Sequence, residues 1–306
     1  MGILVIGATF VDIKGFPFDN YLPTGRNAGK VEYVHGGVAR NVVEDIANIE
    51  LRPTFLSIVD DTPMGDAVVQ KLKNHKVNTD YVLTRPDGMG TWLAVFDNNG
   101  DVAGSISKRP NMYPIAELLQ EKGDEIFSQV RSVVLEIGLD KEIVKGTLAL
   151  CQKHGVKSFA LVANMSIAAE RRDLLQQFDC VICNQQEAGI LFLDDYEDKT
   201  PEEMREILQE RIAAANIPAM VVTMGAAGAV YANLQGENGV CPARNVQVKD
   251  TTGAGDSFCA GVAIGMTYGK TMAEAVQIGT TLAASVITSS ENVCPRFRPE
   301  ELGIQI

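Results

Sequence analysis

The segment Asp250-Thr251-Thr252-Gly253-Ala254-Gly255-Asp256 combines residue types that could support transfer of a phosphoryl group. Its small residues precede an apolar run of helical spacing that begins with Phe258, so they are predicted to form the start of a helix. The first turn of a helix leaves backbone N–H groups without partners and carries partial positive charge, which suits a phosphate. The carboxylate of Asp256 beside that cradle could accept a proton from an attacking hydroxyl.

Asp256 is also predicted to be weakly basic. A free aspartic acid has a pKa near 3.9, and a helix N-terminus favours the ionised form further. We therefore expect Asp256 to accept a proton late in the transfer or to orient the hydroxyl. A purely structural interpretation also fits, because small residues permit close packing at a helix start, and Gly261 and Gly265 continue the small face.

Paired glycines, Gly36 and Gly37, precede a second predicted helix, so the backbone there could approach a ligand closely. Asn41 would lie about one turn into that helix, and it offers the donor and acceptor atoms that a polyhydroxylated ligand requires. Asp12, just past the first predicted strand, could accept hydrogen bonds from sugar hydroxyls. A glycine turn with only a capping role explains Gly36 and Gly37 equally well.

Two further groups of residues directly follow predicted strands, and in a parallel sheet the carboxyl ends of the strands carry the ligand. Asn184 and Glu187 could share one face of a helical turn and hold a hydrated Mg²⁺ near phosphates. A capping role for Asn184 is the alternative. The turn that contains Thr223, Gly225 and Gly228 could approach a nucleotide.

Short β-rich runs alternate with helical patterns, which favours an α/β fold with a mostly parallel sheet flanked by helices. The predicted strands are Ile3–Gly7, Thr54–Val59, Ser132–Leu135, Ser158–Val162, Cys180–Cys183 and Met220–Thr223. The predicted helices are Val38–Ile49, Met64–His75, Lys141–His154, Ile167–Gln177 and Pro201–Ala215. With no internal repeat or long linker, we expect a single domain over residues 1–306.

Two segments interrupt this alternation. Residues 13–34 are polar, glycine-rich and irregular, with short β-like pieces, whereas Thr91–Phe96 and Val102–Ser107 are predicted strands joined by a hairpin turn at Asn99-Gly100. We expect a small β insert at about residues 13–34 and 88–110 that could cover a substrate as a lid. A surface ribbon or an oligomer contact is the alternative. Because exposed strand edges often pair, a homodimer through the lid is a hypothesis.

Composition and charge narrow the function classes. The net charge of −12 argues against non-specific nucleic-acid binding, which needs clustered Lys and Arg. No apolar run reaches the roughly 18 residues of a membrane span, and the apolar start Met1–Gly7 lacks the basic residues of a signal peptide. Six scattered cysteines suit free thiols in a reducing compartment. We therefore expect a cytoplasmic protein with no membrane or nucleic-acid partner.

The order of these motifs resembles the PfkB family of carbohydrate kinases, also called the ribokinase family. The resemblance covers nearly the whole chain, and the segment from Asp250 to Asp256 is its most specific part. It implies a ribokinase-like, Rossmann-like α/β domain with a small β-sheet lid. It also implies transfer of the γ-phosphate of ATP to a hydroxyl of a sugar or nucleoside.

The resemblance implies a role for each motif. Asp256 matches the family's catalytic base, and Gly253, Ala254 and Gly255 match its anion hole. The substrate-binding positions are Asp12, Gly36, Gly37 and Asn41. The positions tied to Mg²⁺, phosphate and nucleotide are Asn184, Glu187, Thr223, Gly225 and Gly228. The positions that would supply ligands to a monovalent cation such as K⁺ are Asp250 and Thr252. The adenine pocket is expected to draw on Asn245–Val248 and Thr280–Ala284.

Within the family, Asn27–Lys30, Gly36–Asn41 and Ser289–Pro295 are similar to segments of pseudouridine kinases and their relatives, which favours a pseudouridine-like nucleoside or a ribose-type sugar as acceptor. The chain departs from that pattern at Lys108 and Arg109, where those kinases tend to carry an acidic residue. These two side chains could face a phosphorylated or acidic sugar, or could point to water. An alternative from another class is a sugar- or nucleotide-sensing protein without catalysis.

Overall fold

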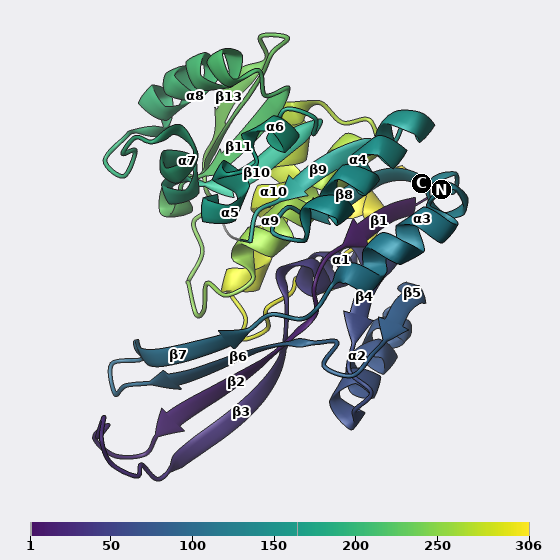
Figure 1. Cartoon of the computed structure of the whole chain (residues 1–306). Coiled ribbons are helices and arrows are strands. Elements are labelled where there is room, and N and C mark those ends of the chain that lie inside the picture. The colour runs from purple at the N-terminus through teal and green to yellow at the C-terminus, as the bar shows by residue number, and fades with distance from the viewer. Residues whose placement is uncertain (1, 164, 306) are drawn as a thin grey trace.

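Residues 2–163 and 165–305 are described by the computed structural model, and they form two separate β-sheets with helices around the larger one (Figure 1). The larger sheet has nine strands in the order β13-β12-β11-β10-β9-β8-β1-β4-β5. Neighbouring strands are parallel from β11 to β5, and β12 and β13 form an antiparallel edge. The strands are β1 (Gly2–Ile6), β4 (Thr54–Val59), β5 (Asn78–Thr84), β8 (Val130–Glu136), β9 (Lys157–Leu161), β10 (Cys180–Asn184), β11 (Ala219–Thr223), β12 (Ala229–Asn233) and β13 (Asn238–Cys241).

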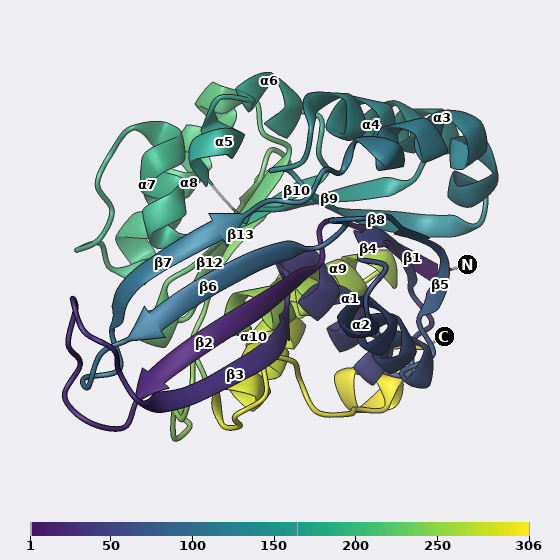
Figure 2. The same ribbon diagram turned by 60° about the horizontal axis from the view of Figure 1, so that its bottom comes forward.

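Alternation along the central strand β1 divides the hydrophobic core into two layers. Ile3 and Val5 pack on one face of the sheet, and Leu4 and Ile6 pack on the other. The helices on the Ile3 face are α1 (Val38–Asn48), α2 (Pro63–Asn74), α9 (Ala254–Thr267) and α10 (Met272–Ile287). The helices on the Leu4 face are α3 (Tyr113–Phe127), α4 (Lys141–His154), α5 (Met165–Ala169), α6 (Arg172–Leu175), α7 (Gln185–Phe192) and α8 (Pro201–Ala215) (Figure 2). Two 3₁₀ turns lie at η1 (Gly225–Ala227) and η2 (Pro299–Leu302).

The smaller sheet has four strands in the order β3-β2-β6-β7 and projects from one end of the molecule (Figure 1). Its strands are β2 (Phe10–Pro17), β3 (Gly29–Gly36), β6 (Gly90–Phe96) and β7 (Val102–Lys108). The prediction of an irregular segment at 13–34 is wrong in part, since β2 and β3 pair antiparallel over eight residues each. Because β2 also pairs with β6, its backbone groups are satisfied on both sides despite the weak apolar alternation.

The hairpin turn predicted between β6 and β7 is confirmed. Gly100 has a positive φ of 87° and its N–H donates to the carbonyl of Asp97 at 3.2 Å. The helix predicted at 167–177 is instead two short helices, α5 and α6, with a break before Arg172. Arg171 at that break has non-helical backbone angles, and its guanidinium donates to the carbonyls of Ile137 and Leu139, so a tertiary contact overrides the helical pattern.

Candidate active site

The helix predicted after the glycine-rich segment is α9, whose N-terminal cap is Gly253. Gly253 has a φ of 82°, and a Cβ there would lie 2.0 Å from the carbonyl oxygen of Asn292. Only glycine can adopt this left-handed turn so close to the backbone of Asn292. The segment therefore delivers Asp256 to the first turn of α9, beside the backbone amides that begin the helix.

Asp256 accepts a hydrogen bond from Asn41, with Nδ2 of the amide 2.6 Å from Oδ2 of the carboxylate. Its withdrawal from water raises the pKa of Asp256 to about 7, although the Asn41 hydrogen bond and the nearby Arg40 charge act in the opposite direction. The expectation of a weakly basic Asp256 is wrong, because desolvation outweighs the helix terminus. A carboxyl group that titrates near neutral pH is suited to proton transfer.

A cavity of about 640 Å³ opens in front of Asp256, and its walls come from both sheets. Asp12 from β2 and Asn41 from α1 line it, together with Gly37 between them. Gly36 does not line the cavity, but a Cβ at this residue would lie 2.5 Å from Oδ1 of Asp12. Burial raises the pKa of Asp12. The structure thus brings Asp12, Gly37 and Asn41 into one cavity with Asp256, and Gly36 lies directly behind Asp12.

Side chains that the motifs did not single out also line this cavity, among them Phe10, Trp92 and Glu136. Glu136 ends strand β8 and accepts a hydrogen bond from the amide of Ala8 at 2.9 Å, and burial raises the pKa of its carboxyl. It could have been found in the sequence, because it follows an apolar strand at the same sheet edge as Asn184. Trp92 gave no such signal, since its strand belongs to the small sheet.

The two basic residues at the end of β7 have different surroundings. Lys108 is exposed and forms an ion pair with Asp87, with Nζ 2.6 Å from Oδ1. Arg109 lines the cavity that contains Asp12 and Asp256. Of the two, the structure places only Arg109 where a substrate in that cavity could meet it.

A second cavity of about 570 Å³ lies on the other side of the α9 start. Thr223, Gly225 and Gly228 line it beside Ala254 and Gly255. Segments 245–248 and 280–284, which were expected to form an adenine pocket, meet here. Their lining residues are Asn245, Val246, Val248, Thr280, Ala283 and Ala284. The cavity is thus walled by the predicted nucleotide turn, the first turn of α9 and apolar residues of α10.

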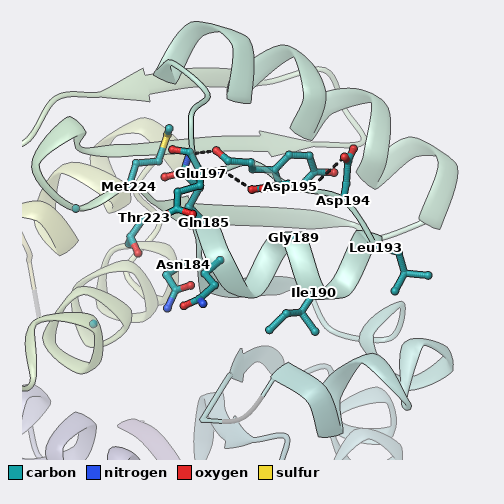
Figure 3. A pocket seen from close by; sticks show the side chains of 14 residues that line it. Asn184, Gln185, Gly189, Ile190, Leu193, Asp194, Asp195, Glu197, Thr223 and Met224 are labelled. Carbon is teal, nitrogen blue, oxygen red and sulfur yellow. Dashed lines mark hydrogen bonds between the residues drawn. The ribbon is translucent and has the colours of Figure 1, made fainter. Parts of the chain in front are cut away.

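A third cavity of about 1130 Å³ follows helix α7 and shares Thr223, Gly225 and Gly255 with the second (Figure 3). Asn184 lies at the same end of this cavity as Thr223, and Leu193 lies at the opposite end (Figure 3). Acidic side chains also line it, namely Asp194, Asp195 and Glu197.

Asn184 and Glu187 form a reciprocal cap on α7. Oδ1 of Asn184 accepts from the Glu187 amide, Oε2 of Glu187 accepts from the Asn184 amide, and both distances are 2.8 Å. Burial raises the pKa of Glu187. Asn184 lines the third cavity, whereas Glu187 lies one turn into α7 behind it. The capping interpretation describes their mutual contacts.

Asp250 and Thr252 lie on the exposed loop before α9, and the Thr252 amide donates to Oδ1 of Asp250 at 2.8 Å. That hydrogen bond lowers the pKa of Asp250. Among the described residues, no group of three or more His, Cys, Asp or Glu side chains has the arrangement of a metal site. No helix within the described ranges has the length and apolar character needed to cross a membrane.

The fold is an α/β architecture in which the glycine-rich start of α9 lies between two cavities. Residues 2–294 match the family described as pfkB family carbohydrate kinase, and the chain belongs to that family. It is a phosphotransferase with an alcohol group of a sugar or nucleoside as acceptor. The family and activity class expected from the motifs are confirmed.

Known relatives agree with this assignment. The chain is 36% identical to guanosine-inosine kinase of Exiguobacterium acetylicum over 292 residues, which is 95% of each chain. It is 25% identical to pseudouridine kinase of Escherichia coli K12, over 90% of this chain and 87% of that one. The structure of Arabidopsis thaliana ribokinase complexed with ribose and ATP superimposes with a TM-score of 0.87 at 20% identity, over 98% of each chain. The ribokinase-like fold is confirmed.

Proposed function

We propose that this protein transfers the γ-phosphate of ATP to a ribose hydroxyl of a nucleoside, and that a purine nucleoside of the guanosine or inosine type is its preferred acceptor. The observation that carries the proposal is the single cavity that joins Asp256 to polar and aromatic walls. Asp12 and Asn41 would bind ribose hydroxyls, and Trp92 and Phe10 offer flat surfaces for a base. The 36% identity to a guanosine-inosine kinase supports the same acceptor.

In this proposal Asp256 accepts the proton of the attacking hydroxyl, for which a pKa of about 7 is well matched. The amides of Gly253, Ala254 and Gly255 stabilise the charge that develops on the transferred phosphoryl group. ATP lies in the second cavity, with its base against α10 and its phosphates at the start of α9. The contribution of the chain is therefore mainly positioning and electrostatic stabilisation.

Asn184 and Glu187 fit an indirect role in binding Mg²⁺. Burial raises the pKa of Glu187, so a nearby cation would favour its ionised form. The third cavity adjoins the second at Thr223, Gly225 and Gly255, and a cation would offset the negative charge of its acidic side chains. Mg²⁺ would neutralise charge on the phosphates and is expected to keep several waters.

Asp250 and Thr252 are exposed oxygen donors before the start of α9, and we propose them as ligands of a monovalent cation such as K⁺.

An assay of ADP release tests the proposed function directly. Guanosine, inosine, pseudouridine, ribose, fructose and phosphosugars would be compared as acceptors at fixed ATP and Mg²⁺. We expect the highest kcat/KM for a purine nucleoside and loss of activity on chelation of Mg²⁺. No ADP release with any acceptor would favour a non-catalytic sensor of sugars or nucleotides.

A phosphosugar or acidic-sugar acceptor is the second candidate, and Arg109 is the observation that favours it. Its guanidinium lies at the wall of the acceptor cavity, where it could pair with a phosphate or carboxylate of the substrate. The same panel separates the two candidates, because a phosphosugar kinase would release ADP with phosphosugars and not with nucleosides.

We also propose that two copies associate through the small sheet. Tyr33, Ile13, Leu93 and Ile106 are paired in register across its four strands and so share one face. The exposed fractions of Tyr33, Leu93 and Ile106 are 62%, 41% and 70%. A second copy would cover this apolar row. Light scattering should find a dimer that Ile106→Glu dissociates, and a monomeric wild type would contradict the proposal.

The six free cysteines support a reducing, cytoplasmic location.

A further inference from the structure

The side chain of Arg40 is fully removed from solvent, and it is among the largest side chains in the interior of the protein. It lies in α1, one residue before Asn41, and no motif assigns it a role. A buried guanidinium is retained only where its charge and its five N–H donors find partners. Its partners therefore show what the side chain does.

The guanidinium of Arg40 has three kinds of partner. One nitrogen, Nη2, donates to the side-chain oxygen Oδ1 of Asn41 and to the carbonyl of His35. Nε donates to the carbonyl of Gly36 at 3.4 Å. Nη1 forms an ion pair with Oε2 of Glu44 at 2.5 Å, and Oε1 of Glu44 lies 2.9 Å from Nζ of Lys71. The charge of Arg40 is thus compensated inside the fold.

The contact with Asn41 decides how the Asn41 amide is oriented. The oxygen and the nitrogen of an asparagine amide have nearly the same size, so shape alone does not select one orientation. Arg40 can only donate, and it therefore holds the oxygen of Asn41. The amide nitrogen is then turned toward Asp256, to which it donates at 2.6 Å. In the opposite orientation two oxygens would face each other.

The contacts with His35 and Gly36 tie the same guanidinium to the small sheet. Both carbonyls belong to the last two residues of β3, where the small sheet joins α1. The carbonyl of His35 also accepts from Nδ2 of Asn292, which lies beside Gly253 at the start of α9. One planar group therefore joins the end of the small sheet, the Asn41 amide and, through that amide, Asp256.

We propose that Arg40 is a positioning residue for phosphoryl transfer, which holds the amide of Asn41 with its N–H group toward Asp256 and fixes that pair to the end of β3. This inference rests on the proposed role of Asp256 as the proton acceptor. Glu44 acts indirectly, since its ion pair with Arg40 fixes the orientation of the guanidinium plane. Lysine could keep the charge beside Glu44, but its single ammonium cannot reproduce the fork of donors.

A double-mutant cycle between Arg40→Lys and Asn41→Ala tests the proposal. We expect Arg40→Lys to lower kcat roughly 10- to 100-fold, since misplacement of a reacting group by about 1 Å can cost that much. KM for ATP should not change, because the nucleotide lies in the other cavity. In the Asn41→Ala background, Arg40→Lys should have no further effect on kcat, because it acts through the Asn41 amide. Equal effects in the two backgrounds would overturn the proposal.

A double variant separates the loss of positioning from the loss of stability that an unpaired buried charge would cause. The double variant Arg40→Met/Glu44→Leu removes both fully buried charges together. Lys71, which also pairs with Glu44, is 35% exposed, so water can solvate its ammonium in this variant. Its kcat should fall as in Arg40→Lys, and the acidic limb of kcat/KM should move to higher pH. The Arg40 charge lowers the pKa of Asp256, whereas the carboxylates of Glu136 and Glu187 raise it. Asp45 is coupled to Asp256 in the same way, and Arg109 lines the same cavity.

Ile46→Val is the matched control, because Ile46 is as buried as Arg40 on the same helix and belongs to the apolar core. It should keep the kcat and the pH profile of the wild type. Arg40 variants that behave like Ile46→Val would overturn the proposal. Wild-type protein is assayed in parallel, and its failure to release ADP with any acceptor would refute the proposed function itself.

Discussion

The side-chain nitrogen of Asn41 lies 2.6 Å from a carboxylate oxygen of Asp256, although 215 residues separate them in the chain. The two side chains come from the first turns of α1 and α9, which pack on the same face of the large sheet. Their contact joins the half of the site that would bind the acceptor to the half that would carry out the transfer.

Replacement of Asp256 by Asn should remove the proton acceptor and keep the shape of the site. We expect kcat to fall by roughly 100-fold or more, as for loss of a general base, while the acceptor still binds. Steady-state kinetics would measure kcat, and calorimetry would measure the affinity for the acceptor. Asp66→Asn is the control, because Asp66 also lies in the first turn of a helix but is exposed on α2. A D256N variant with near wild-type kcat would exclude Asp256 from the mechanism.

The raised pKa of Asp256 predicts how activity depends on pH. With a pKa of about 7, the fraction of ionised Asp256 increases as pH rises through neutrality, so kcat/KM should rise there and level off above it. Initial rates between about pH 5 and about pH 9 would show this limb. A limb well below about pH 5 would instead fit the ordinary acidity of aspartic acid.

Asp45 predicts a pH dependence of stability. It is fully buried, accepts hydrogen bonds from Ser257 at 2.7 Å and from the Cys294 amide at 2.6 Å, and desolvation raises its pKa to about 7. Between about pH 4 and that value the folded carboxyl binds a proton that the unfolded chain has released. The contribution of Asp45 to the free energy of unfolding therefore decreases as pH rises through this window.

Urea denaturation of the wild type and of Asp45→Asn at several pH values would measure this contribution. The wild type should lose stability relative to Asp45→Asn as pH rises, because asparagine does not titrate. The exposed Asp66→Asn control should follow the wild type. A difference between wild type and Asp45→Asn that is independent of pH would contradict the prediction.

Trp92 should contribute to acceptor binding and not to ATP binding. It lines the acceptor cavity, and loss of stacking with a base is worth roughly 1–3 kcal/mol. Trp92→Ala is therefore expected to raise KM for a nucleoside about 10-fold or more and to leave KM for ATP unchanged. Trp92→Phe, which keeps a flat ring, should raise KM for the nucleoside less than Trp92→Ala does. An unchanged nucleoside KM in Trp92→Ala would show that the base lies elsewhere.

Ala283 offers the reciprocal test of the nucleotide cavity. It lies on α10 at the wall of the second cavity, so Ala283→Leu would occupy space proposed for the base of ATP. We expect KM for ATP to rise about 10-fold, within the range of overpacking effects, with nucleoside KM unchanged. Ala283→Ser keeps the size of the side chain and should behave like the wild type. Equal changes in both Michaelis constants would argue against two separate cavities.

Strands and helices of the large sheet could be predicted from the sequence because their apolar periodicity is local. The runs Thr54–Val59 and Pro201–Ala215 agree with β4 and α8 to the residue. The small sheet was harder, since β2 and β3 depend on pairing with neighbours more than on their own alternation. The break before Arg172 depends on carbonyls at residues 137 and 139, more than 30 positions away, and no local pattern records it.

The sequence by itself determined the chemistry, because the types and order of residues from Asp12 to Asp256 are those of a sugar or nucleoside kinase. It also indicated the helix start at Gly253, since the positive φ there favours glycine locally, although the close approach of the Asn292 carbonyl comes from the fold. Tertiary structure decided the acidity of Asp256, which depends on the removal of water by distant elements. It also decided the surroundings of Trp92, Glu136 and Arg40, which come from other parts of the chain. Desolvation and side-chain contacts are properties of the assembled fold, and a linear pattern does not contain them.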